Sequence, residues 1–160
     1  MSRRLPILLL ALAPLTAQAD FKSGLAAYEV GDYVTALREW RPLAEEGMAA
    51  AQYNVGLIHQ HGRGVQADPA LALKWYLKAA EGGYDRAQYR VGEMYEAGTG
   101  LQKKDLVQAR LWFRLAEEQK YLDAKKRRKR VAKQMSPEQI AMADMLVRHK
   151  KQAARERGRN

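Results

Sequence analysis

The residue types that carry enzyme chemistry are scarce in this chain, and their spacing favours structural roles. The 160 residues include no cysteine, and the only serines are Ser2, Ser23 and Ser136. The lack of cysteine excludes thiol nucleophiles, disulfides and thiolate metal sites. His59 and His61 stand two positions apart, which directs them to different sides of a helix and disfavours a shared metal ion. We therefore predict no metal, no cofactor and no enzyme activity, with a hydrolase of cell-wall or lactam substrates as a minor alternative.

Two carboxylate pairs and two glycine-rich segments resemble catalytic motifs only superficially. Glu45-Glu46 and Glu117-Glu118 end equivalent helices, whereas the two carboxyls of a glycosidase face each other across a cleft. We expect both pairs to be solvated helix ends. Gly62-Arg63-Gly64 and Gly98-Thr99-Gly100 lie between predicted helices, whereas a phosphate-binding loop follows a strand. We predict that these segments are helix-ending turns.

An internal repeat determines the predicted architecture. Residues 47–66 and 83–102, aligned at an offset of 36, share nine identities among twenty positions. Beyond the glycines the offset becomes 37 and aligns Trp75 with Trp112. Each unit predicts a helix A, over 48–61 and 84–97, followed by a helix B, over 69–81 and 105–118. Glycine recurs inside helix A at Gly56 and Gly92, where it costs about 1 kcal/mol relative to alanine, so we expect close helix packing there.

The flanking sequence predicts incomplete repeats that close the stack at both ends. Upstream we expect a half-repeat, and downstream a degenerate helix A over 122–135. A capping-box start at Ser136-Pro137-Glu138-Gln139 predicts a last helix through Lys151. The predicted organisation begins with a signal segment over 1–19 and a half-repeat over 20–46. Two full repeats follow, over 47–82 and 83–119. Basic capping helices over 120–151 and a disordered tail over 152–160 end the chain.

The pattern A-Q-Y-x-V-G, then G-x-G-V/L-Q, then D, A and W-Y or W-F resembles Sel1-like repeats, which are relatives of tetratricopeptide repeats. Ala51-Gln52, Gly62-Arg63-Gly64-Val65 and Trp75-Tyr76 carry the resemblance in the first unit. His59 stands where the family usually has tyrosine, so we expect it to replace that tyrosine in packing. The resemblance implies an all-α fold, an α-solenoid of antiparallel helix pairs used for protein interaction and common in bacterial envelopes.

The first nineteen residues have the layout of a secretory signal peptide. Arg3 and Arg4 precede an apolar run, and Ala17-Gln18-Ala19 supplies a small-residue cleavage site before Asp20. We predict cleavage after Ala19, a periplasmic location and no transmembrane segment afterwards. Export also argues against a nucleic-acid partner.

The net charge is unevenly distributed along the chain. Residues 20–102 contain 8 Lys+Arg and 11 Asp+Glu, a net charge of −3, whereas residues 103–160 contain 18 and 7, a net charge of +11. A run of six basic residues is a candidate anion-binding patch: Lys125, Lys126, Arg127, Arg128, Lys129 and Arg130. Two interpretations stay open, a solvated helix that keeps the stack soluble and a contact with anionic lipid or cell-wall polymer.

The A helices line the concave surface in tetratricopeptide-type solenoids, so the resemblance implies a binding groove there. The candidate groove residues are Tyr53, Leu57, Gln60, Arg86, Tyr89, Arg90, Glu93 and Glu96. Tyrosines mixed with charges suit the recognition of a peptide or a partner loop. The first functional hypothesis is therefore a periplasmic adaptor, scaffold or regulator for another envelope protein. The alternative is an attachment module that binds anionic lipid or cell-wall polymer through the basic C-terminus.

Overall fold

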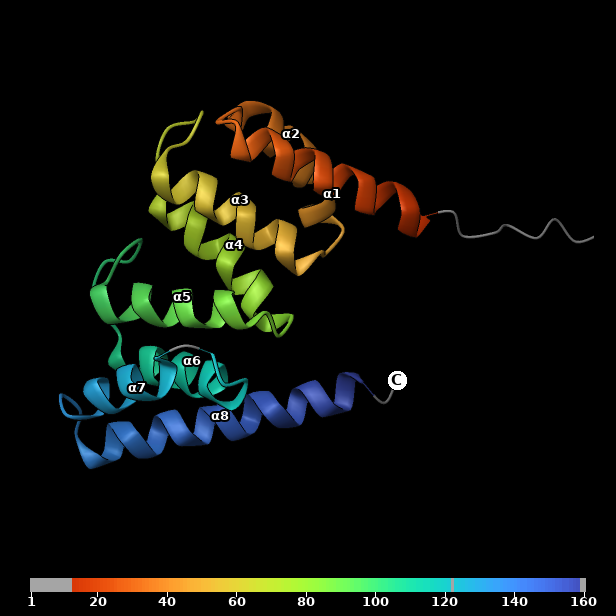
Figure 1. Ribbon diagram of the computed structural model, residues 1–160. Coiled ribbons are helices and arrows are strands. Elements are labelled where there is room, and N and C mark those ends of the chain that lie inside the picture. The colour runs from red at the N-terminus through yellow and green to blue at the C-terminus, as the bar shows by residue number, and fades with distance from the viewer. Residues whose placement is uncertain (1–12, 122, 159–160) are drawn as a thin grey trace, which may run out of the picture.

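The computed structural model describes residues 13–121 and 123–158, and these residues form helices joined by short turns (Figure 1). The helices are α1 (Ala13–Glu29), α2 (Tyr33–Glu45), α3 (Ala49–His61), α4 (Pro69–Glu81), α5 (Asp85–Ala97), α6 (Leu106–Glu118), α7 (Ala124–Ala132) and α8 (Pro137–Arg157). No strand occurs among these residues. The prediction of an all-α solenoid of helix pairs is confirmed.

Helices α1 to α7 pack mainly on their neighbours in the chain, as expected of a solenoid, whereas α8 packs on α6. The pairs α1–α2, α3–α4 and α5–α6 stack in order from α1 to α6, and α6 also packs against α7 and α8. Helices A and B of both units lie within one residue of their predicted bounds. The predicted degenerate helix A over 122–135 is shorter, and corresponds to α7.

The same capping residue begins each B helix. Asp32, Asp68 and Asp105 precede α2, α4 and α6, and each carboxylate accepts a hydrogen bond from the backbone N–H three residues later, at 3.0, 2.9 and 3.0 Å. This contact satisfies an N–H that has no partner within the helix. Gly62 and Gly98 end α3 and α5 in the left-handed conformation, with φ of +63° and +78°. The prediction that these glycines form turns is confirmed.

Glycine inside helix A makes room for an aromatic ring of helix B. A Cβ atom added to Gly56 would lie 2.6 Å from the Tyr76 ring, and one added to Gly92 would lie 2.8 Å from the Phe113 ring. Both distances are far shorter than van der Waals contact. The close packing that the recurrent glycines predicted is confirmed.

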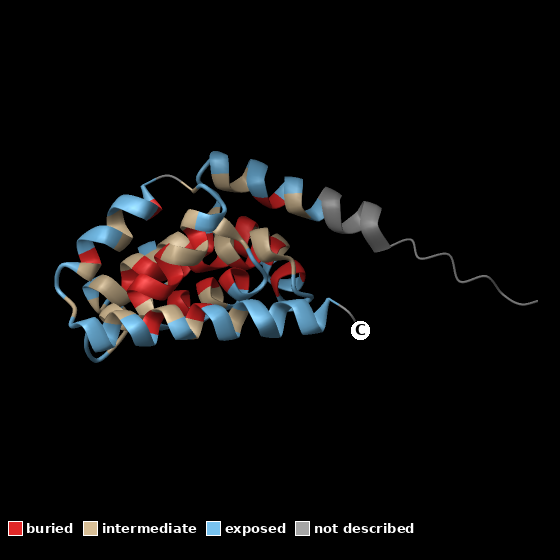
Figure 2. Ribbon diagram, turned by 90° about the horizontal axis from the view of Figure 1, so that it is seen from below, coloured by how far each residue is buried: buried red, intermediate tan, exposed pale blue. Residues whose placement is uncertain are grey.

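The core runs along the stack between the A and B helices, as the buried residues in Figure 2 show. A buried glutamine at the start of each full repeat connects it to the preceding helix. Gln52 Nε2 donates to the Ala44 carbonyl at 3.0 Å, and Gln88 Nε2 donates to the Ala80 carbonyl at 3.2 Å. These bonds give each buried glutamine amide a partner at the end of the preceding helix, α2 or α4, which accounts for glutamine following alanine in both units.

The last helix is longer than we predicted. Helix α8 begins with the expected capping box of Ser136 and Gln139, but it continues to Arg157, so the prediction of a disordered tail from residue 152 is wrong. Ala153 and Ala154 have high helix propensity, and Gln152 Nε2 donates to Glu156 Oε1 at 3.0 Å across one turn. Of the predicted signal segment, residues 1–12 lie outside the described part, and residues 13–19 belong to α1.

Candidate functional site

Three successive A helices, α3, α5 and α7, line a shared hollow of about 350 Å³. We call it the A-helix hollow, and its polar lining residues are Gln60, Arg90, Glu93, Glu96, Thr99, Arg127 and Arg130. Four of these belong to the predicted groove, and two belong to the predicted anion-binding patch. The tertiary structure therefore brings the two candidate sites together.

Basic residues of α7 pair with the acidic residues of α5 across this hollow. Arg127 contacts both Glu93 and Glu96, and its Nη1 lies 3.2 Å from Glu96 Oε2. Arg130 Nη2 lies 2.7 Å from Glu96 Oε1. On α5 itself, Arg90 Nη1 lies 2.9 Å from Glu93 Oε2. The charged groups are thus connected in a network that holds their side chains in place.

The network shifts the proton affinities of its members. Burial on its own would lower the pKa of Arg127, but its hydrogen bonds to Glu93 and Tyr89 and the nearby charge of Glu96 raise that pKa above its usual value. Burial on its own would lower the pKa of Arg90, but Glu93, Tyr53 and Tyr76 together raise it above its usual value. Both guanidinium groups therefore stay charged, and the hollow presents fixed charges of both signs.

The two tyrosines of the predicted groove are packing residues as well as lining residues. The Tyr53 ring lies 5.4 Å, between centroids, from both Tyr76 and Tyr84. The Tyr89 ring lies 5.4 Å from Phe113 and 5.3 Å from Tyr121. Both tyrosines are half-buried.

The other groove candidates differ in their solvent exposure. Leu57 is half-buried against the core, and Gln60 Oε1 accepts a hydrogen bond from the Tyr76 hydroxyl at 2.7 Å. Arg86 is exposed. The line of residues predicted on α3 is therefore mostly part of the packing, whereas the charged line on α5 faces the hollow.

The basic run divides into inward and outward residues. Lys125, Lys126 and Lys129 are exposed, whereas Arg127 and Arg128 are 23% and 16% exposed and form ion pairs. Six consecutive basic residues surround a helix, so some must lie on the side where Ala124 and Val131 are buried. The predicted anion-binding patch is therefore not uniform, and its exposed lysines, Lys125, Lys126 and Lys129, are the residues that stay available for binding an anion.

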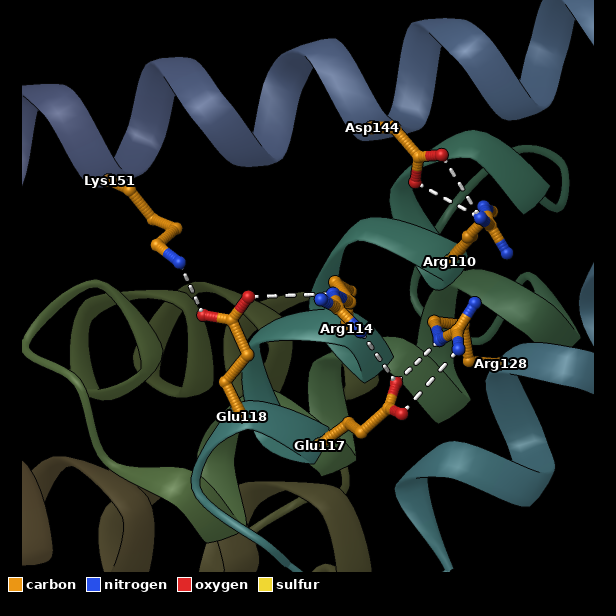
Figure 3. Close-up of polar contacts among 7 residues, drawn as sticks. All are labelled: Arg110, Arg114, Glu117, Glu118, Arg128, Asp144 and Lys151. Carbon is orange, nitrogen blue, oxygen red and sulfur yellow. Dashed lines mark hydrogen bonds and ion pairs between the residues drawn. The ribbon is translucent and has the colours of Figure 1, made fainter.

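The expectation that Glu117-Glu118 is a solvated helix end is wrong for Glu117, whereas Glu118 is exposed. Glu117 is 16% exposed and binds Arg128, with Arg128 Nε 2.5 Å from Oε2. Arg114 contacts both glutamates, and Lys151 Nζ lies 2.9 Å from Glu118 Oε2 (Figure 3). Burial would raise the pKa of Glu117, but the hydrogen bonds and charges of Arg128 and Arg114 together lower it. Packing of α7 and α8 against α6 converts a helix end into the centre of an ion-pair network.

The histidines do not lie together. His59 is 6% exposed, and its Nε2 has no hydrogen-bond partner among the described residues, whereas His61 is exposed. Burial, with a smaller effect from Arg41, lowers the pKa of His59. Within residues 13–121 and 123–158, no group of three His, Asp or Glu side chains could hold a metal ion. His59 packs in the core of the first repeat, as its place in the repeat predicted.

The ion pair between Arg110 and Asp144 connects α8 to α6, and neither residue was among the predicted site residues. Arg110 Nη2 donates to both oxygens of Asp144, at 3.0 and 3.2 Å, and the Arg110 side chain is only 8% exposed. The sequence gives little indication of this pair. Arg110 directly follows Ala109, which is buried in α6, and the repeat has no position that corresponds to Asp144.

Comparison with known proteins agrees with this geometry. The family pattern described as the Sel1 repeat matches residues 49–84 and 85–121. The chain contains two Sel1 repeats. The predicted units, 47–82 and 83–119, begin two residues before each match. The resemblance to Sel1-like repeats is confirmed.

Two solved structures share the Sel1 fold with this chain. One is c5321, a protective antigen of uropathogenic Escherichia coli that displays an SLR fold, with 31% identity and a TM-score of 0.78 over 84% of this chain and 29% of that one. The other is a Sel1 repeat protein from Oxalobacter formigenes, with 34% identity and a TM-score of 0.64 over 68% of this chain and 44% of that one.

Two curated relatives match a shorter segment of the Sel1 repeat region. The mouse and rat proteins called DAP3-binding cell death enhancer 1 are each 42% identical over 50 residues, which is 31% of this chain and 10% of theirs. The chain thus spans a small part of these relatives and less than half of the two solved structures.

Sel1 repeat proteins generally mediate protein–protein interactions and are typically non-catalytic scaffolds. None of the helices in the described part of this Sel1 repeat chain is both long and apolar enough to cross a membrane.

Proposed function

We propose that this Sel1 repeat protein is a non-enzymatic adaptor that binds another protein of the cell envelope at the A-helix hollow. The observation that carries the proposal is the set of fixed charges that two helices present in one hollow, Arg90, Glu93 and Glu96 from α5 and Arg127 and Arg130 from α7. Charges held in place before binding cost little side-chain entropy when a partner docks.

The chemistry of the hollow favours a protein segment over a small apolar ligand. Small-molecule pockets are usually lined mainly by hydrophobic and aromatic side chains, whereas seven of the nine lining residues here are polar or charged. Both signs of charge are present within a few ångströms. A partner loop or peptide of mixed charge can complement such a surface, and this complementarity selects the partner and its orientation.

We also propose that the protein is exported and acts in the periplasm after cleavage behind Ala19. In the part of α1 from Asp20 onward, whose side chains the structure describes, Phe21, Gly24 and Tyr28 contact Trp40, and this is compatible with cleavage after Ala19. Trp40 Nε1 also donates to the Phe21 carbonyl at 3.1 Å. These contacts stay intact in a chain that begins at Asp20.

A photo-reactive amino acid placed in the hollow tests the adaptor function. Thr99 is exposed and lines the hollow, so a photo-reactive residue there should cross-link one partner protein in living cells. Lys129 is the control, since it is exposed but does not line the hollow. A single protein adduct specific to position 99 supports the proposal. Equal adducts at both positions, or none at position 99, would contradict it.

The exposed Lys125, Lys126 and Lys129 favour a second candidate function, attachment to anionic lipid or cell-wall polymer. Such binding should weaken strongly in raised salt, because exposed charges are screened within about 8–10 Å at physiological ionic strength. Replacing the three lysines by glutamine should abolish co-sedimentation with anionic vesicles. Retention of the triple variant would remove this candidate.

A further inference from the structure

A second hollow, larger than the first and of different charge, opens between α6, α7 and α8. Its volume is about 730 Å³, and we call it the α6–α8 cleft. Six cationic side chains line it against two carboxylates, Glu118 and Asp144. The cations are Arg110, Arg114, Arg128, Arg148, Lys151 and Arg155.

The carboxylates already in the cleft show what its arginines bind. Asp144 places both oxygens on Arg110, and Glu117, beside the cleft, receives Arg128 at 2.5 and 3.5 Å (Figure 3). Arg128 pairs two guanidinium nitrogens with the two oxygens of Glu117, the geometry to which a planar guanidinium is suited, whereas Arg110 uses Nη2 alone. The cleft is therefore built for carboxylate groups.

Part of the positive charge is left uncompensated. Among residues 13–121 and 123–158, neither Arg148 nor Arg155 has a carboxylate within ion-pair distance, and both are exposed. Arg110 is 8% exposed, it lines the cleft, and its Nε has no hydrogen-bond partner among the described residues. Burying a guanidinium with an unsatisfied N–H costs free energy. A further acidic group in the cleft would compensate the exposed charges of Arg148 and Arg155.

We propose that the α6–α8 cleft binds an acidic, extended segment of a partner protein. The α8 residues that line it run from Asp144 to Arg155, a length of about 16 Å along the helix axis. An extended peptide covers that length with about five residues. Several carboxylates along such a segment can reach Arg148 at one point and Arg155 two turns further along α8.

The position of the charges favours a peptide over a membrane or a lone phosphate. Arg110 and Arg128, at 8% and 16% exposed, are recessed below α8, where a flat lipid surface does not reach them. The cations are also spread along two turns of α8, which a single small anion cannot span. This inference does not depend on the adaptor function proposed for the A-helix hollow, because it concerns residues of α6 and α8 outside that hollow.

Binding of a fluorescent hexaglutamate peptide, followed by anisotropy in about 50 mM salt, tests the proposal. The cleft variant is Arg148→Glu with Arg155→Glu, and the control is Lys74→Glu with Lys103→Glu, which makes the same change in net charge on exposed residues outside the cleft. We expect the cleft variant to bind about tenfold more weakly or worse, and the control to stay within about threefold of the unmodified protein. Circular dichroism should show equal helicity for all three proteins.

Three outcomes would overturn the inference. Equal weakening by both double variants would mean that only net charge matters. Displacement of the peptide by inorganic phosphate at low millimolar concentration would assign the cleft to a small anion. The third outcome is binding of the protein to phosphatidylglycerol vesicles. If the cleft variant loses this binding and hexaglutamate does not block it, the cleft is assigned to a lipid surface. Cross-linking at Thr99 reports on the other hollow, so it can succeed or fail whichever result is obtained here.

Discussion

Arg127 of α7 reaches across to Glu96 of α5, with 3.2 Å between Nη1 and Oε2, and so connects two helices that lie one repeat apart. The sequence separates these residues into a groove and a basic run, yet they form one network. The same pairing docks α7 on the stack and forms one wall of the A-helix hollow.

Replacing Arg127 by alanine should destabilise the protein by about 1–3 kcal/mol. The change leaves Glu93 and Glu96, which are 24% and 14% exposed, without their Arg127 partner. Urea unfolding followed by circular dichroism measures the effect. Lys126→Ala is the control, because Lys126 is exposed on the same helix and should change the stability by less than about 0.5 kcal/mol. Equal effects of the two substitutions would show that the network does not hold α7.

Gly56→Ala should lower the stability by about 1–3 kcal/mol through overpacking, although alanine is the better helix former. The added methyl group would lie 2.6 Å from the Tyr76 ring. Thermal unfolding measures the change. Gly158→Ala is a suitable control, since a Cβ there would come no closer than 3.7 Å to the surrounding atoms. A stabilised Gly56→Ala variant would contradict the close packing.

Lys120→Gly should stabilise the protein by about 0.5–1 kcal/mol. Lys120 has a φ of +59°, and it occupies the repeat position that Gly47 and Gly83 fill with φ of +99° and +87°. Glycine adopts this left-handed conformation without the steric cost that lysine bears. Lys120→Ala keeps a Cβ atom and should bring no gain, so the two variants separate backbone strain from the loss of charge.

His59 should make the protein less stable as the pH falls from 7.5 towards 5.5. Burial lowers its pKa below 6.5 in the folded state, with Arg41 adding to the effect and Asp68 opposing it. The unfolded chain therefore takes up a proton on this residue at a higher pH than the folded chain does, and stability declines below about pH 6.5. His59→Tyr, which restores the residue usual in Sel1-like repeats, should flatten the dependence measured by urea unfolding. An unchanged slope would show that His59 is not its source.

Glu117 should cause a second loss of stability, at a lower pH than the loss caused by His59. Its pKa in the folded state is lowered by Arg128 from 4.5, so its contribution is complete above that value and disappears as the pH falls through the folded pKa. Arg128→Gln should reduce the loss of stability between about pH 5 and pH 3. If Arg128→Gln leaves the acid limb of the stability curve unchanged, another carboxylate governs it.

The export proposal predicts that a periplasmic extract contains this protein and that its chain there begins at Asp20. N-terminal sequencing checks this directly, and replacing both Ala17 and Ala19 by leucine should leave the precursor uncleaved, because the cleavage site requires small residues. A mature chain that still carries residues 1–19 would contradict the export proposal.

The elements of the two repeats could be predicted closely because their signals are local. Aspartate at each B-helix start, glycine at each A-helix end and the recurrent Gly56 and Gly92 act within one helix pair, and the second copy confirms the first. The end of α8 was predicted poorly, since no glycine or proline stops the helix at Lys151 and the alanines beyond it extend the helix.

The charged sites could not be predicted in the same way. Glu93, Glu117 and Arg110 find their partners 34, 11 and 34 residues away along the chain. A run of basic residues indicates its total charge, but the side on which each residue lies depends on how α7 docks.

The sequence by itself determined the solenoid, its repeat phase and its caps, because these depend on backbone conformation and on packing between neighbouring helices. Only the tertiary structure decided which charges compensate one another and which stay free. Ion pairs form where independent helices bring their surfaces together, so the A-helix hollow and the α6–α8 cleft exist only after α7 and α8 have packed against the stack.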